Sequence, residues 1–94
     1  MIEITLKGQE HLEAVLNTSP ALMTNISKNS IHHDVILFYL DRGEELEDIY
    51  FKLVDAYPGD PETGSRKFAY EVDQAHRNGY IVGTGGIGFE YEDL

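Results

Sequence analysis

Cysteine is absent from the 94 residues of this chain. Disulfide bonds and thiolate metal sites are therefore excluded, and cysteine usage gives no indication of the redox compartment. Long apolar runs are also missing, because no stretch reaches the roughly 18 residues that are needed to span a bilayer. The N-terminus lacks the pattern of a secretory signal peptide. We therefore expect a cytoplasmic protein that has no membrane partner.

Basic residues are scarce, since seven Lys and Arg stand against 17 Asp and Glu, which gives a formal net charge of −10. A chain this acidic is repelled at long range by nucleic acids and by anionic membranes. The charge is unevenly distributed. Residues 41–62 hold eight acidic and two basic residues, whereas residues 63–83 hold two acidic and three basic ones. Of these two segments, only residues 63–83 are not net acidic.

Motifs that carry catalysis or bind a cofactor are missing as well. No Ser/His/Asp signature is visible along the chain. The glycine-rich residues 83–88 follow an apolar run, as the phosphate loop of a dinucleotide site does. Such a site also requires a helix that begins directly after the glycines, and alternating β-type residues follow here instead. We expect a non-enzymatic protein without a cofactor, in which these glycines form the tip of a hairpin.

The length and composition predict one globular domain over residues 1–94. A chain of this size can build one small hydrophobic core. Hydrophobic residues make up 41% and charged residues 26%, and these ordinary values disfavour disorder. No internal repeat divides the chain. We expect a strand and short helices over residues 1–30, followed by three helices and a hairpin over residues 31–94.

The N-terminal part predicts one strand and two short helices. Residues 1–7 alternate between apolar and polar side chains, as in a half-buried strand, and Gly8 is expected to end it. Residues 9–17 then place apolar side chains at helical spacing. The second helix begins with Ser19 as its cap and proline at its first position, and it ends near Lys28.

Two further helices are predicted over residues 31–41 and 45–57. The apolar run in the first is compatible with a buried strand or a buried helix. A capping Ser30 and a terminating Gly43 favour the helix. The second is clearly amphipathic, and carboxylates near its N-terminal end complement the helix dipole. These residues are Glu44, Glu45, Glu47 and Asp48. Residues 58–61 read Pro-Gly-Asp-Pro and predict a turn outside any helix.

The neighbouring residues His32 and His33 raise the question of a metal site. Adjacent residues on a helix point about 100° apart, so the two histidines are not expected to share a face. Neither histidine finds a second ligand one helical turn further on. His11 and His76 are isolated in the sequence. We therefore predict no metal site.

Residues 64–78 predict the longest helix of the chain. Phe68, Val72 and Ala75 recur at i, i+4 and i+7 and form one apolar stripe. Thr63 or Ser65 is expected to cap the helix, and the Asn-Gly pair after it supplies a C-terminal stop. The apolar period then changes to two, which predicts a hairpin over residues 80–92.

Helix, helix, turn, helix and hairpin follow one another from residue 31 to residue 92. Together with the segments 66–72 and 76–81, this order resembles a winged helix-turn-helix domain. The resemblance implies an α+β fold of helices with a small antiparallel sheet, built from the N-terminal strand and the C-terminal hairpin. It also implies that helix 64–78 enters the major groove of DNA. The candidate DNA-binding side chains are Arg66, Lys67, Tyr70, Gln74 and Arg77.

Arginine and glutamine read guanine and adenine edges, and lysine contacts phosphate. Asp73 lies within this face, however, and the expected wing, residues 84–94, carries three acidic residues and no basic one. The helix face is also compatible with a merely solvated surface held by the i, i+4 pairs Lys67–Glu71 and Asp73–Arg77.

Two functional hypotheses follow from these charges. In the first, the chain is a small acidic regulator or adaptor that binds a basic protein partner. Its binding residues are then Glu44, Glu47 and Asp48. In the second, the chain is a DNA-binding transcriptional regulator with helix 64–78 as its recognition helix. A homodimer would double the DNA contacts in that case.

Overall fold

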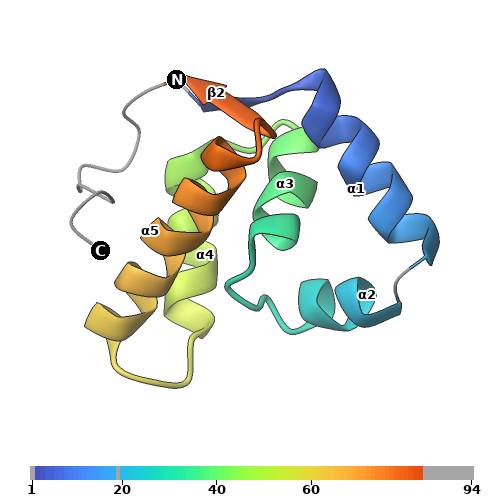
Figure 1. The fold of residues 1–94 in the computed structure, drawn as a ribbon. Coiled ribbons are helices and arrows are strands. Elements are labelled where there is room, and N and C mark those ends of the chain that lie inside the picture. The colour runs from blue at the N-terminus through green and yellow to red at the C-terminus, as the bar shows by residue number, and fades with distance from the viewer. Residues whose placement is uncertain (1, 19, 84–94) are drawn as a thin grey trace.

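Five helices and one short sheet make up the part of the chain that the computed structural model describes, residues 2–18 and 20–83, with the backbone alone at residues 21 and 22. The elements in chain order are β1 (Ile2–Ile4), α1 (Leu6–Thr18), α2 (Pro20–Ser27), α3 (His33–Asp41), α4 (Leu46–Ala56), α5 (Pro61–Arg77) and β2 (Ile81–Gly83). The described part is mostly helical. Figure 1 shows α3 at its centre, with α1 and α2 on one side and α4 and α5 on the other.

The sheet joins the two ends of the described chain. β1 and β2 run antiparallel, with Ile2 opposite Gly83 and Ile4 opposite Ile81. This pairing confirms that the N-terminal strand meets the chain that follows the longest helix. The rest of the predicted hairpin, residues 84–92, and most of its glycine tip lie outside the described residues.

The first strand is shorter than predicted, because α1 begins at Leu6 and includes Gly8. Thr5 explains the early start of the helix. Its Oγ1 accepts from the Gly8 N–H at 3.0 Å and donates to the Gly79 carbonyl at 2.7 Å. Its N–H donates to the Tyr80 carbonyl at 2.9 Å. The prediction that Gly8 ends the strand is therefore wrong, because the Thr5–Tyr80 bond extends the register of the sheet by one pair and the Thr5 hydroxyl then starts the helix.

The helical interpretation of residues 31–41 is confirmed. α3 starts at His33, and His32 caps it in place of Ser30, because the His32 side chain accepts from the Asp34 N–H. The next three residues, Val35, Ile36 and Leu37, have no exposed surface. A helix that is covered on every side does not need a polar face, which explains its unbroken apolar run.

The longest helix begins earlier than predicted, at Pro61 instead of residue 64. Asp60 caps it by accepting from the Thr63 N–H at 3.3 Å, so the predicted caps Thr63 and Ser65 are wrong. Pro61 lies in the first turn, where its missing N–H has no partner to lose. The prediction of a non-helical turn over residues 58–61 therefore holds only up to Asp60.

The core lies between α3, α4 and α5. The predicted stripe of Phe68, Val72 and Ala75 is fully buried. The Phe68 ring meets the Tyr50 ring edge to face at 5.3 Å between centroids. α4 and α5 lie side by side and run in opposite directions (Figure 1). Among the described residues, no helix is long and apolar enough to cross a membrane.

Candidate functional site

The predicted acidic residues lie at and just before the start of α4. Glu47 and Asp48 are exposed, whereas Glu44 is half-buried and accepts from Lys52 at 2.8 Å. Glu44 and Glu47 line the same pocket, of about 290 Å³, and Asp48 does not. The other lining residues are Ile2, Leu40, Gly43, Glu45 and Leu46.

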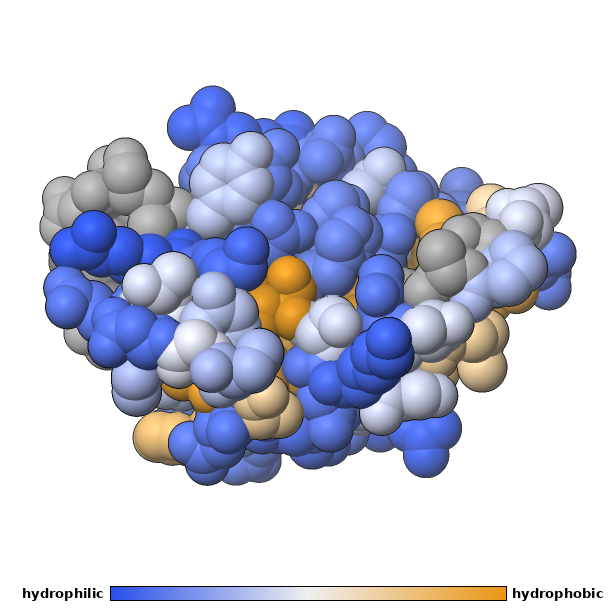
Figure 2. All heavy atoms as spheres, turned by 90° about the horizontal axis from the view of Figure 1, so that it is seen from below, coloured by the Kyte–Doolittle hydropathy of each residue, from blue (hydrophilic) through white to orange (hydrophobic). Residues whose placement is uncertain are grey.

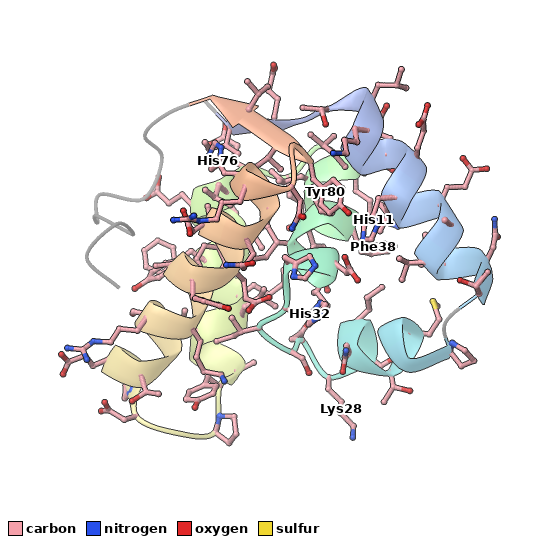
Figure 3. All side chains as sticks on the ribbon, viewed as in Figure 1. His11, Lys28, His32, Phe38, His76 and Tyr80 are labelled. Atoms are coloured by element: carbon pink, nitrogen blue, oxygen red, sulfur yellow. The ribbon has the colours of Figure 1, made fainter. Side chains whose placement is uncertain are left out.

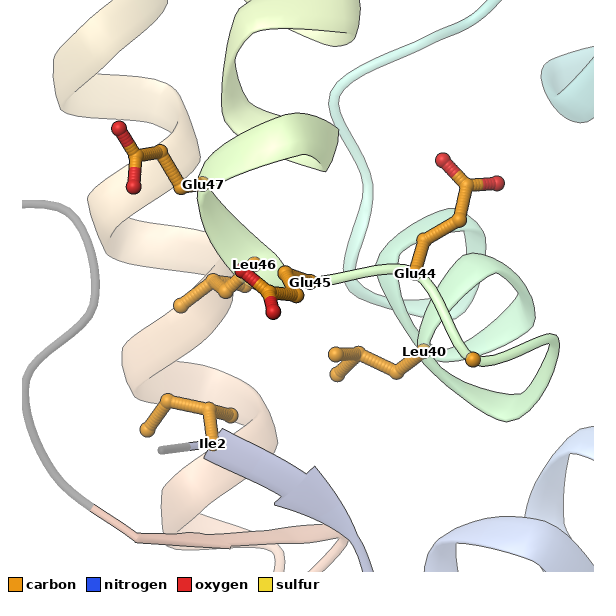
Figure 4. Close-up of a pocket in the computed structure, with 7 residues that line it drawn as sticks. Ile2, Leu40, Glu44, Glu45, Leu46 and Glu47 are labelled. Carbon is orange, nitrogen blue, oxygen red and sulfur yellow. The ribbon is translucent and has the colours of Figure 1, made fainter.

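This pocket combines an apolar floor with acidic neighbours. Figure 4 shows Ile2, Leu40 and Leu46 pointing into one space, with the Glu45 carboxylate beside it. The carboxylates of Glu44 and Glu47 point away from that space (Figure 4). An apolar floor with a nearby carboxylate suits a ligand that is aliphatic along its length and cationic at its tip.

An exposed aromatic ring lies further along the same helix. Phe51 is 53% exposed, and it falls outside the buried stripe of Leu46, Ile49 and Leu53. On a helix, residues three and four positions away are its neighbours. At those positions stand Glu47, Asp48 and Asp55, together with the half-buried Val54. We call Glu44, Glu45, Glu47, Asp48, Phe51 and Asp55 the acidic face of α4. Phe51 was not among the predicted binding residues, although its position off the apolar stripe of α4 was a usable signal.

The predicted DNA-binding residues on α5 differ from one another in their surroundings. Arg66 and Arg77 are both exposed, and each is paired with a carboxylate one turn earlier. The Arg66 guanidinium donates to Glu62 at 3.0 Å, and that of Arg77 donates to Asp73 at 2.6 Å, which confirms the predicted Asp73–Arg77 pair. The hydrogen bond and the charge of Asp73 raise the pKa of Arg77.

Tyr70 lies between these two ion pairs along α5 and is 50% exposed, while Gln74 is half-buried. The two exposed arginines of α5 therefore carry charges that are already offset within the helix. Between these two ion pairs, the ring of Tyr70 is the side chain most available for contact with a partner.

Lys67 is placed differently from the prediction. The expected Lys67–Glu71 pair is not among the ion pairs of the described residues, and Glu71 accepts from His33 instead. Lys67 lines a hollow of about 430 Å³ with Lys28 and with residues 29–31 and 56–58. Figure 2 shows the molecule from below, as a largely hydrophilic face with a hydrophobic area near its centre and others toward its edges.

The histidines that the sequence separates come together in space. His32 lies before the helix with an extended backbone, so its ring stacks against that of His33 with 4.4 Å between centroids. His11 of α1 places its Nε2 atom 2.9 Å from Asp34 Oδ1. The predictions that the two neighbouring histidines diverge and that His11 is isolated are therefore wrong. Figure 3 shows His11, His32 and Tyr80 gathered near α3, whereas His76 lies apart from them.

Glu71 of α5 completes this group. Its Oε1 accepts from the backbone N–H of His33 at 2.9 Å and lies 2.9 Å from His33 Nδ1. The hydrogen bond to Glu71 raises the pKa of His33, and the charges of Asp34 and Glu71 add to it against the opposing effect of burial. Burial acts to raise the pKa of Glu71, but its bonds to His33 outweigh burial and leave that pKa lowered.

We call His11, His32, His33, Asp34 and Glu71 the histidine cluster. It joins α1, the start of α3 and α5, and the Tyr80 ring stacks on His11 at 4.3 Å between centroids. Comparison of the chain with protein-family models, with curated proteins and with solved structures gives no match. A function for this chain therefore rests on the geometry and chemistry of its own residues.

Proposed function

We propose that this protein is a small acidic regulator or adaptor, not an enzyme, that binds a basic protein partner through the acidic face of α4. The observation that carries the proposal is the pocket floored by Ile2, Leu40 and Leu46 beside Glu45. A lysine or arginine of the partner has an aliphatic stem for such a floor and a cationic head for the carboxylate.

Phe51 supports the same conclusion. Aromatic residues, phenylalanine included, are enriched in the cores of protein–protein interfaces, where surrounding contacts exclude water. This ring is half exposed and has acidic residues at the neighbouring helix positions. A basic segment with one apolar side chain would therefore contact both the ring and its carboxylates.

The charge of the whole segment adds long-range attraction. Residues 41–62 hold eight acidic and two basic residues, a net charge of −6. Like-signed charge on one surface steers an oppositely charged partner and raises its association rate, an effect that falls with ionic strength. We expect binding of the partner to weaken as salt is added.

The frame that carries this face is, in our proposal, of the winged-helix type. The order α3, α4, α5 and β2, with β2 paired to the N-terminal strand, supports it. The same order favours the alternative function, DNA binding by α5. Against it, Glu62 and Asp73 offset the charges of Arg66 and Arg77 and would repel phosphates.

A pair of charge-matched variants tests the proposal. The variant Glu47→Lys with Asp48→Lys reverses two exposed residues of the acidic face, and Glu10→Lys with Glu13→Lys makes the same change in net charge on the exposed side of α1. Proteins captured by the wild type and by each variant would be compared, and the affinity of the leading basic partner would then be measured. We expect only the α4 variant to lose binding.

Equal losses in the two variants would show that net charge alone holds the partner, and this would overturn the assignment to α4. The DNA alternative is tested with random-sequence duplex DNA at about 50 and about 200 mM salt. Tight binding that weakens steeply with salt, and that disappears in Arg66→Glu with Arg77→Glu, would make α5 the working surface instead.

A further inference from the structure

Three ligand-type atoms converge within the histidine cluster. Asp34 Oδ1 lies 2.9 Å from His11 Nε2 and 3.4 Å from His33 Nε2. All three atoms lie within 4.8 Å of one another. In a tetrahedral zinc site, bonds of about 2.0–2.1 Å separate neighbouring ligand atoms by roughly 3.3 Å. Two of the three distances, 2.9 and 3.4 Å, are therefore close to the edge of such a tetrahedron, and the third pair of atoms lies within 4.8 Å.

The proton inventory also points to a cation. A neutral imidazole has one N–H donor and one acceptor nitrogen, and a carboxylate only accepts. Since His33 Nδ1 lies 2.9 Å from Glu71, its proton belongs on that nitrogen. His33 Nε2 is then left with a lone pair and lies 3.4 Å from Asp34 Oδ1, which also lies 2.9 Å from His11 Nε2. This arrangement of nitrogen and oxygen atoms can be bridged by a second proton on His33 or by a metal ion.

The rings are held in place by groups outside this trio. Glu71 accepts from both the Nδ1 and the backbone N–H of His33, as carboxylates behind metal-binding histidines do. The Tyr80 ring stacks on His11 at an interplanar angle of 13°. The Asp34 side chain is only 12% exposed. These contacts orient the ligand atoms before an ion arrives, which lowers the entropic cost of binding.

We propose that His11, His33 and Asp34 form a binding site for one zinc ion. Imidazole nitrogen and carboxylate oxygen suit several first-row divalent ions, and zinc is the one among them that binds such ligands in a tetrahedron. His32 is left out, because its Nδ1 already accepts from the Asp34 N–H at 3.1 Å. Glu71 orients His33 from behind and is not a ligand. Three protein ligands leave the fourth position to water or to a donor from another molecule.

Zinc titration of the full chain, freed of metal by a chelator, tests the site. We expect calorimetry to show one ion per chain and Co²⁺ to give the visible absorption of a tetrahedral site. His11→Gln and His33→Gln should lose binding, whereas His32→Asn, which keeps an acceptor for the helix cap, should bind as the wild type does. Glu71→Gln should keep the stoichiometry with about 10–100-fold weaker affinity.

A measurement on the unaltered protein guards against variants that fail to fold. In NMR spectra of the imidazole nitrogens, zinc should shift the Nε2 resonances of His11 and His33, the proposed ligand atoms. The resonances of His76 should stay unchanged. Absence of both heat and shifts would mean that a second proton on His33 satisfies the cluster, and the proposal would fail. Loss of binding in His32→Asn but not in His11→Gln would overturn the ligand set.

Discussion

Gly8 lies where α1 packs against the chain between α5 and β2. A Cβ atom at this position would lie 2.3 Å from the Tyr80 carbonyl oxygen and 2.8 Å from Ile4 Cγ1. Alanine favours a helix over glycine by about 1 kcal/mol, but the clash is with backbone and has little room to relax. We expect Gly8→Ala to lower the free energy of unfolding by about 1–3 kcal/mol in spite of its helix propensity.

Urea denaturation measures this effect, with Glu13→Ala as the control on the exposed side of the same helix. The control should change the free energy of unfolding by no more than about 0.5 kcal/mol. A Gly8→Ala protein as stable as the wild type would contradict the close approach of α1 to Tyr80.

The His33–Glu71 pair makes the stability of the metal-free protein depend on pH. The raised pKa of His33 contributes stability that is fully present below its ordinary value of 6.5 and is lost as the pH rises through the folded value. The lowered pKa of Glu71 contributes stability above its ordinary 4.5, which is lost as the pH falls through the folded value. The pair is therefore most stabilising between pH 4.5 and 6.5.

The difference in free energy of unfolding between the wild type and His33→Gln measures this contribution, with a chelator present so that only protons titrate the cluster. Asp34 and Glu71 face the His33 ring, and the rings of His11 and His32 lie beside it. We expect the difference to be largest inside that pH window and to shrink on both sides. A difference that grows steadily toward pH 9 would contradict the assignment.

At the level of the elements, the start of α5 depends on one side chain. Asp60 Oδ2 accepts from the Thr63 N–H at 3.3 Å and lies 3.4 Å from the Thr63 hydroxyl. Asp60→Ala removes this cap, and we expect it to lower the free energy of unfolding by about 1 kcal/mol. Asp60→Asn keeps a capping oxygen and should cost less. Thermal or urea unfolding of both variants provides the comparison.

If Thr63→Ala lowered the free energy of unfolding more than Asp60→Ala does, Thr63 would be the cap, as the sequence pattern indicates. The position of the cap matters beyond stability. It sets the first turn of α5, where Glu62 offsets the charge of Arg66. The helix that the winged-helix resemblance assigns to DNA therefore begins with a residue that opposes that role.

For the molecule as a whole, the net charge of −10 acts against the compact state. Raising the ionic strength from about 10 to about 150 mM shortens the screening length from about 30 to about 8 Å, so distant carboxylates cease to repel one another. We expect the free energy of unfolding to rise over this range, as measured by urea denaturation at each salt concentration.

The variant Glu10→Lys with Glu13→Lys serves as a control, because two such reversals reduce the net charge from −10 to −6. Its stability should respond less to salt. A wild type that salt destabilises would indicate that close ion pairs, such as Lys52–Glu44, outweigh the general repulsion.

Local sequence was sufficient for most of the helices. The stripe of Phe68, Val72 and Ala75 and the helix over residues 45–57 follow from a period of 3.6 residues, which is visible within one stretch of chain. The pairing of the N-terminal strand was also predicted, because the order of the elements resembles that of a winged helix-turn-helix domain. The errors in the predicted secondary structure lie at the ends of the elements. At Thr5 and Asp60, a hydrogen bond from one side chain decides where a helix begins, and several nearby residues offer such a bond.

The histidine cluster depended on tertiary packing. His11 and Asp34 are 23 residues apart, and His33 and Glu71 are 38 apart, so no periodicity links them. Their meeting requires α1 and α5 to lie against opposite sides of the start of α3. Gly8 is a further example. The sequence alone does not distinguish a glycine inside a helix from a glycine that ends a strand. The distinction becomes clear once the Tyr80 carbonyl is known to lie against Gly8. Periodicity reports which face of an element is buried, whereas only packing determines which residues of distant elements meet there.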